Sequence, residues 1–215
     1  MSILKIKITP SLPRTSILLL IAGIIFSGTS GLFAAEKTFY ASEISRIDDN
    51  SGDGKGGKGD AKNGSVLRVG DNRKGVEMRV IVQLPIARYA EIIHAADSVH
   101  LHFTVKDTYG SPSKLELLNL MDENALGIEF DTYHRDSSAP TKSLDINRQK
   151  GRFDADITLW AKEAVLNAKS MLTIRLQAEL DTNALRGNGV SDHFWIEAEG
   201  DKAIRMVVVS PNEPL

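Results

Sequence analysis

One stretch of the chain alternates apolar and polar residues with unusual regularity, and it limits the possible folds most strongly. Ser65–Pro85 reads SVLRVGDNRKGVEMRVIVQLP. In its second half, Met78, Val80, Val82 and Leu84 share one face, and Glu77, Arg79, Ile81 and Gln83 share the other. Alternation with a period of two is the pattern of a strand that is buried on one face. Gly70–Gly75 consists of residues that a connecting turn tolerates. The stretch therefore predicts two half-buried strands joined by a turn.

The same alternation recurs along the rest of the chain. Further strands are predicted at Thr38–Ile47, at residues 99–105, 114–117, 153–157, 172–178, 194–198 and 204–208, and as a short segment at 127–131. A parallel sheet needs a long crossover, usually a helix, between successive strands, and this chain has too few helical segments. Antiparallel sheets bury one face, and two of them pack into a sandwich. The predicted fold class is therefore all-β, an antiparallel β-sandwich with one short helix.

That helix is predicted at Thr158–Ala168. Its apolar residues Leu159, Ala161, Val165 and Leu166 recur at helical spacing. Thr158 is a residue type that caps the start of a helix. Trp160 lies beside the apolar stripe, so we expect it in the core. Ile86–Ala96 also has helical spacing, but it is short, and we expect a turn of helix or a loop there.

The first 35 residues differ from the remainder. A basic start with Lys5, Lys7 and Arg14 precedes Ser16–Ala35, which carries no charge. This layout is typical of a secretory signal peptide, here residues 1–35, with cleavage near Ala34–Ala35. We then expect a mature domain at 36–215 in a secreted protein, extracellular or periplasmic. The alternative is an uncleaved membrane anchor, since twenty uncharged residues can just span a bilayer.

Charge and cysteine content exclude several kinds of partner and site. The leader holds three of the 26 basic residues and none of the 28 acidic ones, which leaves the rest of the chain at a net charge of −5. A mildly acidic chain without basic runs argues against nucleic acid as a partner. The chain has no cysteine, so disulfides and thiolate metal sites are excluded.

Three groups of motifs together resemble the DNRLRE-type domains of secreted bacterial proteins. They are Leu67-Arg68-Val69-Gly70 with its turn and Arg79–Pro85; Phe153–Ile157 running into Leu159-Trp160; and Phe194–Glu197 with Glu199-Gly200 and Ile204–Val209. The resemblance covers roughly residues 38–210. It implies a jelly-roll-like β-sandwich that binds carbohydrate or serves in cell-surface and matrix proteins.

Candidate ligand-binding residues lie on the polar faces of two predicted strands. Phe194 and Ile196 are expected on the inward face of their strand because they are apolar. Trp195 then points outward beside Glu197. Exposed aromatic rings are where sugars stack, with polar groups at their edges. Arg175 and Gln177 lie on the polar face of another strand. We expect non-catalytic binding of an extracellular polysaccharide; the alternative is a structural or adhesive role with envelope proteins as partners.

The sequence does not predict an enzyme. It has neither a nucleophile-elbow motif nor a phosphate-binding glycine loop. A polysaccharide lyase, the third alternative, would draw on Tyr133-His134-Arg135 or on the two histidines of residues 99–105. Those two, His100 and His102, share one strand face because residues two apart point the same way. They are also candidate zinc or copper ligands, but the sequence names no third ligand.

Calcium is the cofactor for which the sequence offers a full set of candidate ligands. Within the glycine-rich loop Asp48–Gly64, oxygen-bearing side chains occur at the positions of an EF-hand-type loop, namely Asp49, Ser51, Asp53 and Asp60. Lys55 and Lys58 and the lack of flanking helices count against this reading. The alternative is a solvated loop without metal, because glycine and lysine favour disorder.

Overall fold

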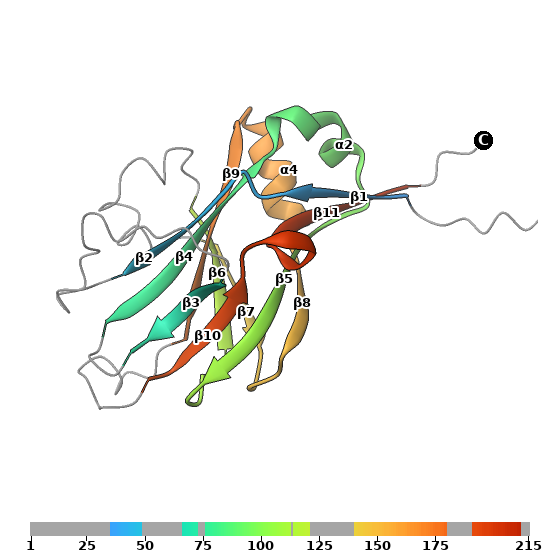
Figure 1. Ribbon diagram of the computed structural model, residues 1–215. Coiled ribbons are helices and arrows are strands. Elements are labelled where there is room, and N and C mark those ends of the chain that lie inside the picture. Colours follow the sequence, from blue (N-terminus) through green and yellow to red (C-terminus); the bar gives the residue numbers. More distant parts are fainter. Residues whose placement is uncertain are drawn as a thin grey trace, which may run out of the picture. The chain divides into compact units, whose positions relative to one another are not determined.

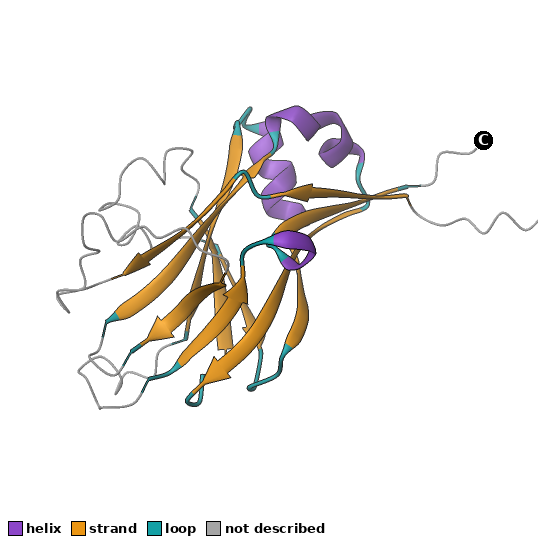
Figure 2. Cartoon of the chain, viewed as in Figure 1, coloured by secondary structure: helices purple, strands orange, loops and turns teal. Residues whose placement is uncertain are grey.

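The computed structural model describes residues 35–48, 66–72, 76–112, 114–120, 140–179 and 191–211. All of them belong to one compact unit, Ala34–Leu215. Strands dominate this part of the chain, as predicted, and two short α-helices accompany them (Figures 1 and 2). The prediction of a single helix is wrong. Neither helix of the described residues has the length and apolar character that a membrane span requires.

The described strands match the predicted segments except β7, which lies where no strand was predicted. The strands are β1 (Ala35–Tyr40), β2 (Glu43–Asp48), β3 (Val66–Asp71), β4 (Glu77–Pro85), β5 (Ser98–Tyr109), β6 (Lys114–Asn119), β7 (Thr141–Asp145), β8 (Gly151–Asp156), β9 (Met171–Ala178), β10 (His193–Glu197) and β11 (Arg205–Ser210). The α-helices are α2 (Ala90–Ala95) and α4 (Thr158–Leu166), and the 3-10 turns are η1 (Ala87–Tyr89) and η3 (Gly200–Lys202). Ile86–Ala96 thus forms a 3-10 turn and a short helix.

The described strands join antiparallel into one curled sheet. Their order is β1-β11-β5-β10-β3-β4-β9-β6-β7, with β2 also paired to β4 and β8 to β5. Met206 and Val208 of β11, near one end of this order, share a single buried core with Leu115 and Leu117 of β6, near the other end. Figure 1 shows the curl that brings these strands around a common inner face. The architecture is therefore sandwich-like.

The first predicted strand is broken into two. β1 pairs with β11, and β2 pairs with β4. Between them, the Ala41 amide donates to the Ile204 carbonyl and the Ser42 amide donates to the Gln83 carbonyl. The chain therefore changes partner within two residues, and a period-two pattern carries no information about such a change.

β3 and β4 form the predicted pair of strands joined by a turn, but β4 departs from the expected one-sided burial. Val80, Val82 and Leu84 are fully buried, as predicted. On the opposite face, Ile81 is also fully buried and Gln83 is 8 % exposed. The prediction that this face is open to water is therefore wrong, and β4 is buried on both faces.

Helix α4 turns a different face inward from the one predicted. Trp160 is buried, as expected, together with Ala161 and Ala164, whereas Leu159 and Leu166 are 75 % and 73 % exposed. The bulky indole sets the buried face. Thr158 is the first helical residue and not the cap. Instead, the Asp156 carboxylate accepts hydrogen bonds from the Thr158 amide at 2.8 Å and from its hydroxyl at 2.6 Å.

Candidate functional site

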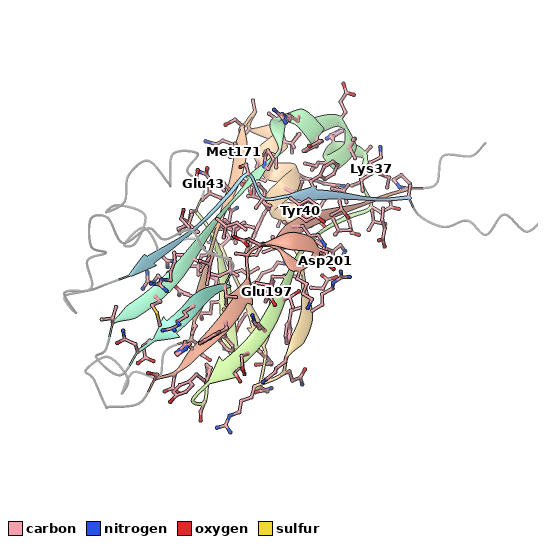
Figure 3. The ribbon with its side chains drawn as sticks, in the orientation of Figure 1. Lys37, Tyr40, Glu43, Met171, Glu197 and Asp201 are labelled. Atoms are coloured by element: carbon pink, nitrogen blue, oxygen red, sulfur yellow. The ribbon has the colours of Figure 1, made fainter. Side chains whose placement is uncertain are left out.

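Trp195 lies on the outer face of β10. Its neighbours Phe194 and Ile196 are fully buried, whereas Trp195 is half-buried. This confirms the register predicted for the strand. Glu197, also half-buried, follows two residues later at the end of β10 (Figure 3). Because residues two apart share a face of a strand, both predicted residues point outward together.

Three rings and a guanidinium form a row over β3, β10 and β5, which we call the aromatic surface: Arg68, Trp195, His193 and Tyr109. Arg68 is opposite Trp195 in the β3–β10 register, with its Cζ 5.0 Å from the indole centroid. The rings of Trp195 and His193 are 6.2 Å apart at 15°, and those of His193 and Tyr109 are 5.4 Å apart at 14°. Near-parallel rings at these separations attract one another. The side chains therefore hold each other in position.

The backbone beneath the aromatic surface is fixed by close packing of β3 on β10. Gly70 is opposite His193 and has a φ of +132°, and a Cβ there would lie 2.7 Å from the His193 Cα. The Asp71 amide donates to the Asp192 carbonyl at 2.8 Å, and the Asp192 amide donates to the Asp71 carboxylate at 2.8 Å. The His193 Nδ1 donates to the Asp71 carbonyl at 3.2 Å. Glycine is required here by both space and conformation.

Burial shifts two pKa values at this junction in opposite directions. His193 is 5 % exposed, and desolvation, assisted by the nearby Arg68 charge, lowers its pKa. Asp71 is 3 % exposed, and desolvation, together with the charges of Asp192 and Glu77, raises its pKa against the hydrogen bond from the Asp192 amide. Burial disfavours the charged form of each group. Both side chains are therefore held toward their neutral forms.

The lowered pKa of His193 predicts a loss of stability on mild acidification. Below about pH 6.5 the unfolded chain binds a proton at this residue that the folded chain resists, so stability falls as the pH falls. We expect the His193→Gln variant to lose part of this dependence between pH 7.5 and 5, whereas His94→Gln, at an exposed position of α2, keeps it. Thermal midpoints across this range measure it. The same slope in His193→Gln and the wild type contradicts the assignment.

The other two predicted ligand-binding residues lie elsewhere. Arg175 is 2 % exposed, so the prediction that it sits on an open face is wrong. Its guanidinium donates to the Gln177 side-chain oxygen at 2.6 Å, and the Gln177 amide donates to Glu116 at 2.7 Å. In the sheet order, β3 and β4 separate β9 from β10. The fold therefore does not bring Arg175 and Gln177 together with Trp195.

A second polar cluster lies on the outer face of β5 and β8. Ser98, His100 and His102 occupy alternate positions along β5 and share its outer face, and Asp154 is opposite His102 in the β5–β8 register. The two histidines hydrogen-bond separate oxygens of Asp154, at 2.7 Å from His100 Nδ1 and 3.1 Å from His102 Nε2. The spacing of the histidines is visible in the sequence, but Asp154 could be found only from the strand register.

The described residues form no site for the predicted metal ions. Across the described ranges, no three histidine or acidic side chains are arranged to hold a metal ion. His100 and His102 share a face as predicted, but each gives a ring nitrogen to the Asp154 carboxylate. The calcium candidates Asp49, Ser51, Asp53 and Asp60, like Tyr133-His134-Arg135 and residues 127–131, lie outside the described residues.

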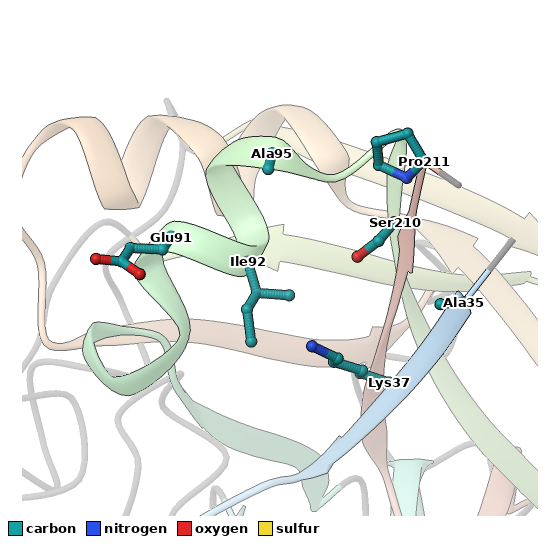
Figure 4. Close-up of a pocket in the computed structure, with 7 residues that line it drawn as sticks. All are labelled: Ala35, Lys37, Glu91, Ile92, Ala95, Ser210 and Pro211. Carbon is teal, nitrogen blue, oxygen red and sulfur yellow. The ribbon is translucent and has the colours of Figure 1, made fainter. Parts of the chain in front are cut away.

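A surface pocket of about 530 Å³ lies between α2 and β1 (Figure 4). Its lining combines apolar residues with a lysine, a glutamate and a serine: Ala35, Lys37, Glu91, Ile92, Ala95, Ser210 and Pro211. Further along β1, the ring of Phe39 packs on Tyr89 with centroids 3.8 Å apart. None of the predicted site residues lines the pocket.

Comparison with protein-family models and with curated proteins finds no match for the chain. The resemblance to DNRLRE-type domains stays a prediction from the motifs quoted above.

Proposed function

We propose that the protein is a binding module for an extracellular polysaccharide and that the aromatic surface contacts the sugar. The observation that carries the proposal is the half-buried Trp195 on an outer sheet face, aligned with the rings of His193 and Tyr109. Tyr109 is 48 % exposed although it is large and partly apolar. Exposed aromatic area of this kind is typical of ligand contacts.

Polar groups surround the rings where sugar hydroxyls would need partners. Arg68 offers guanidinium donors at one end of the aromatic surface, and Glu197 offers carboxylate oxygens beside Trp195. Asp107, opposite Trp195 on β5, forms an ion pair with Lys150 at 2.7 Å. The combination of apolar ring faces and polar edges supports a carbohydrate in preference to a purely apolar ligand.

The fold and the compartment complete the proposal. The sandwich-like curled sheet supports the jelly-roll-like β-sandwich of a DNRLRE-type domain. The basic and then uncharged leader supports export, with cleavage near Ala34–Ala35. Binding outside the cell would then give the module access to extracellular polysaccharides.

A glycan array with the purified protein tests the proposal. We expect retention on a polysaccharide class, and we expect Trp195→Ala to weaken that binding at least about tenfold, because anchoring aromatics carry a large share of binding energy. Leu159→Ala is the matched control, since Leu159 is an exposed apolar residue on α4. No retention on any glycan, or equal retention by Trp195→Ala, contradicts the proposal.

A structural or adhesive role with protein partners is the second candidate. It is favoured by Leu159 and Leu166, which lie seven residues apart on α4 and are both exposed. Residues at this spacing share a helix face. Capture of envelope proteins that is lost in Leu159→Ser with Leu166→Ser, but retained in Trp195→Ala, would favour this candidate over carbohydrate binding.

A further inference from the structure

Ser98, His100 and Asp154 form a continuous hydrogen-bonded chain on the outer face of β5 and β8. The Ser98 Oγ is 2.9 Å from His100 Nε2, and His100 Nδ1 is 2.7 Å from the Asp154 Oδ1. An ionised carboxylate can only accept, so Nδ1 carries the hydrogen and donates to Asp154. In the neutral ring, Nε2 then holds a lone pair, and the Ser98 hydroxyl donates to it. Serine hydrolases activate their nucleophile with this arrangement of groups.

The strands fix each member of the chain. Ser98, His100 and His102 occupy alternate positions of β5 and therefore share one face. The second Asp154 oxygen accepts a hydrogen bond from His102 Nε2 at 3.1 Å, so both carboxylate oxygens are held. Ser98 and His100 are the groups that would meet a substrate. Asp154 and His102 are positioning residues, because they act through His100.

We propose that Ser98, His100 and Asp154 form an esterase site that hydrolyses esters of small carboxylic acids. The proposal goes beyond carbohydrate binding and does not depend on it. The site is open, since the side chains of His100 and Asp154 are 26 % and 51 % exposed. An open sheet face leaves room for a large alcohol group, whereas it offers few contacts to a long acyl chain. Acetyl esters are therefore the substrate class that fits best.

The reaction balances with water as the only co-reactant. The Ser98 Oγ attacks the acyl carbon while its proton passes to His100 Nε2. The bond between the acyl carbon and the alcohol oxygen then breaks, and His100 returns the proton to the departing alcohol. Water attacks the acyl-serine, giving a proton to His100, and the carboxylic acid leaves as Ser98 regains its proton. Proton transfer by a positioned histidine contributes typically about 10²–10⁴-fold to such reactions.

Hydrolysis of p-nitrophenyl acetate and labelling with a fluorophosphonate test the site. We expect the wild-type protein to be labelled at Ser98, as located by mass spectrometry, and to hydrolyse the ester. Ser98→Ala and His100→Gln should each lower the hydrolysis rate by about tenfold or more. Asp154→Asn should slow labelling, and Asp154→Glu should restore part of it, which a merely structural role of the carboxylate would not produce.

Matched controls separate the site from the weak reactivity of any surface histidine or serine. His94→Gln and Ser143→Ala alter exposed residues on α2 and β7 and should leave hydrolysis and labelling unchanged. Ser98→Ala hydrolysing at the wild-type rate overturns the proposal, and so does a wild-type protein that the fluorophosphonate leaves unlabelled at Ser98. The labelling result requires no variant to fold.

Discussion

Replacing Gly70 by alanine is expected to destabilise the protein far more than the same replacement at Gly151. The two glycines have similar backbone angles, with φ of +132° and +124°. A Cβ at Gly151 would meet nothing within 4 Å, whereas at Gly70 it would collide with the Asp192 carbonyl and lie 2.7 Å from the His193 Cα. Gly151→Ala therefore pays the conformational strain alone, about 1–3 kcal/mol. Gly70→Ala adds a backbone collision, and overpacking typically costs about 1–3 kcal/mol more in the free energy of unfolding.

Chemical denaturation of the two variants measures this difference in the free energy of unfolding. The collision at Gly70 is with backbone atoms of the segment that carries His193, so Gly70→Ala should also disturb the aromatic surface and weaken polysaccharide binding. Equal unfolding free energies for Gly70→Ala and Gly151→Ala would show that β3 and β10 do not approach as closely as described.

The two tryptophans are expected to differ sharply in what their removal does to stability. Trp160 is 4 % exposed within the core, so Trp160→Ala should cost about 3–5 kcal/mol. Trp195 is half-buried and its ring interacts with Arg68 and His193, so Trp195→Ala should cost about 1–2 kcal/mol.

Thermal and denaturant unfolding of the two tryptophan variants provide the comparison, with Phe194→Ala as the control for strand register. Phe194 is fully buried next to Trp195, and its truncation should resemble Trp160→Ala. A large destabilisation by Trp195→Ala with little effect of Phe194→Ala would mean that β10 presents its other face to the core.

Local alternation was sufficient to predict most of the described strands, although not β7, and the orientation of Trp195. In β10 the inward residues Phe194 and Ile196 are apolar on both sides of the tryptophan, so one register is clearly favoured. His193 shares the outer face by the same rule and could have been added from the sequence. Arg68 and Tyr109 could not, because their place beside the rings depends on which strands pair with β10.

Features that depend on long-range strand pairing could not be predicted from the sequence. Alternation predicts that Arg175 points to solvent. It is buried instead, because β9, like β4, is covered on both faces. The helix α4 has its buried face set by Trp160, which a count of aliphatic residues overlooks. Asp154 meets His100 and His102 only through the β5–β8 register, 52 or more residues along the chain. Period-two and helical patterns describe local geometry and contain no such register.

Fluorescence of Trp195 during polysaccharide binding tests the central claim most directly. The chain has two tryptophans, so the Trp160→Phe variant keeps an aromatic ring in the core and leaves Trp195 as the single indole reporter. A sugar that covers the half-buried indole removes water from it. We therefore predict a saturable shift of the emission to shorter wavelengths when a polysaccharide retained on the glycan array is added. Saturable binding of that polysaccharide with unchanged Trp195 emission would contradict the account.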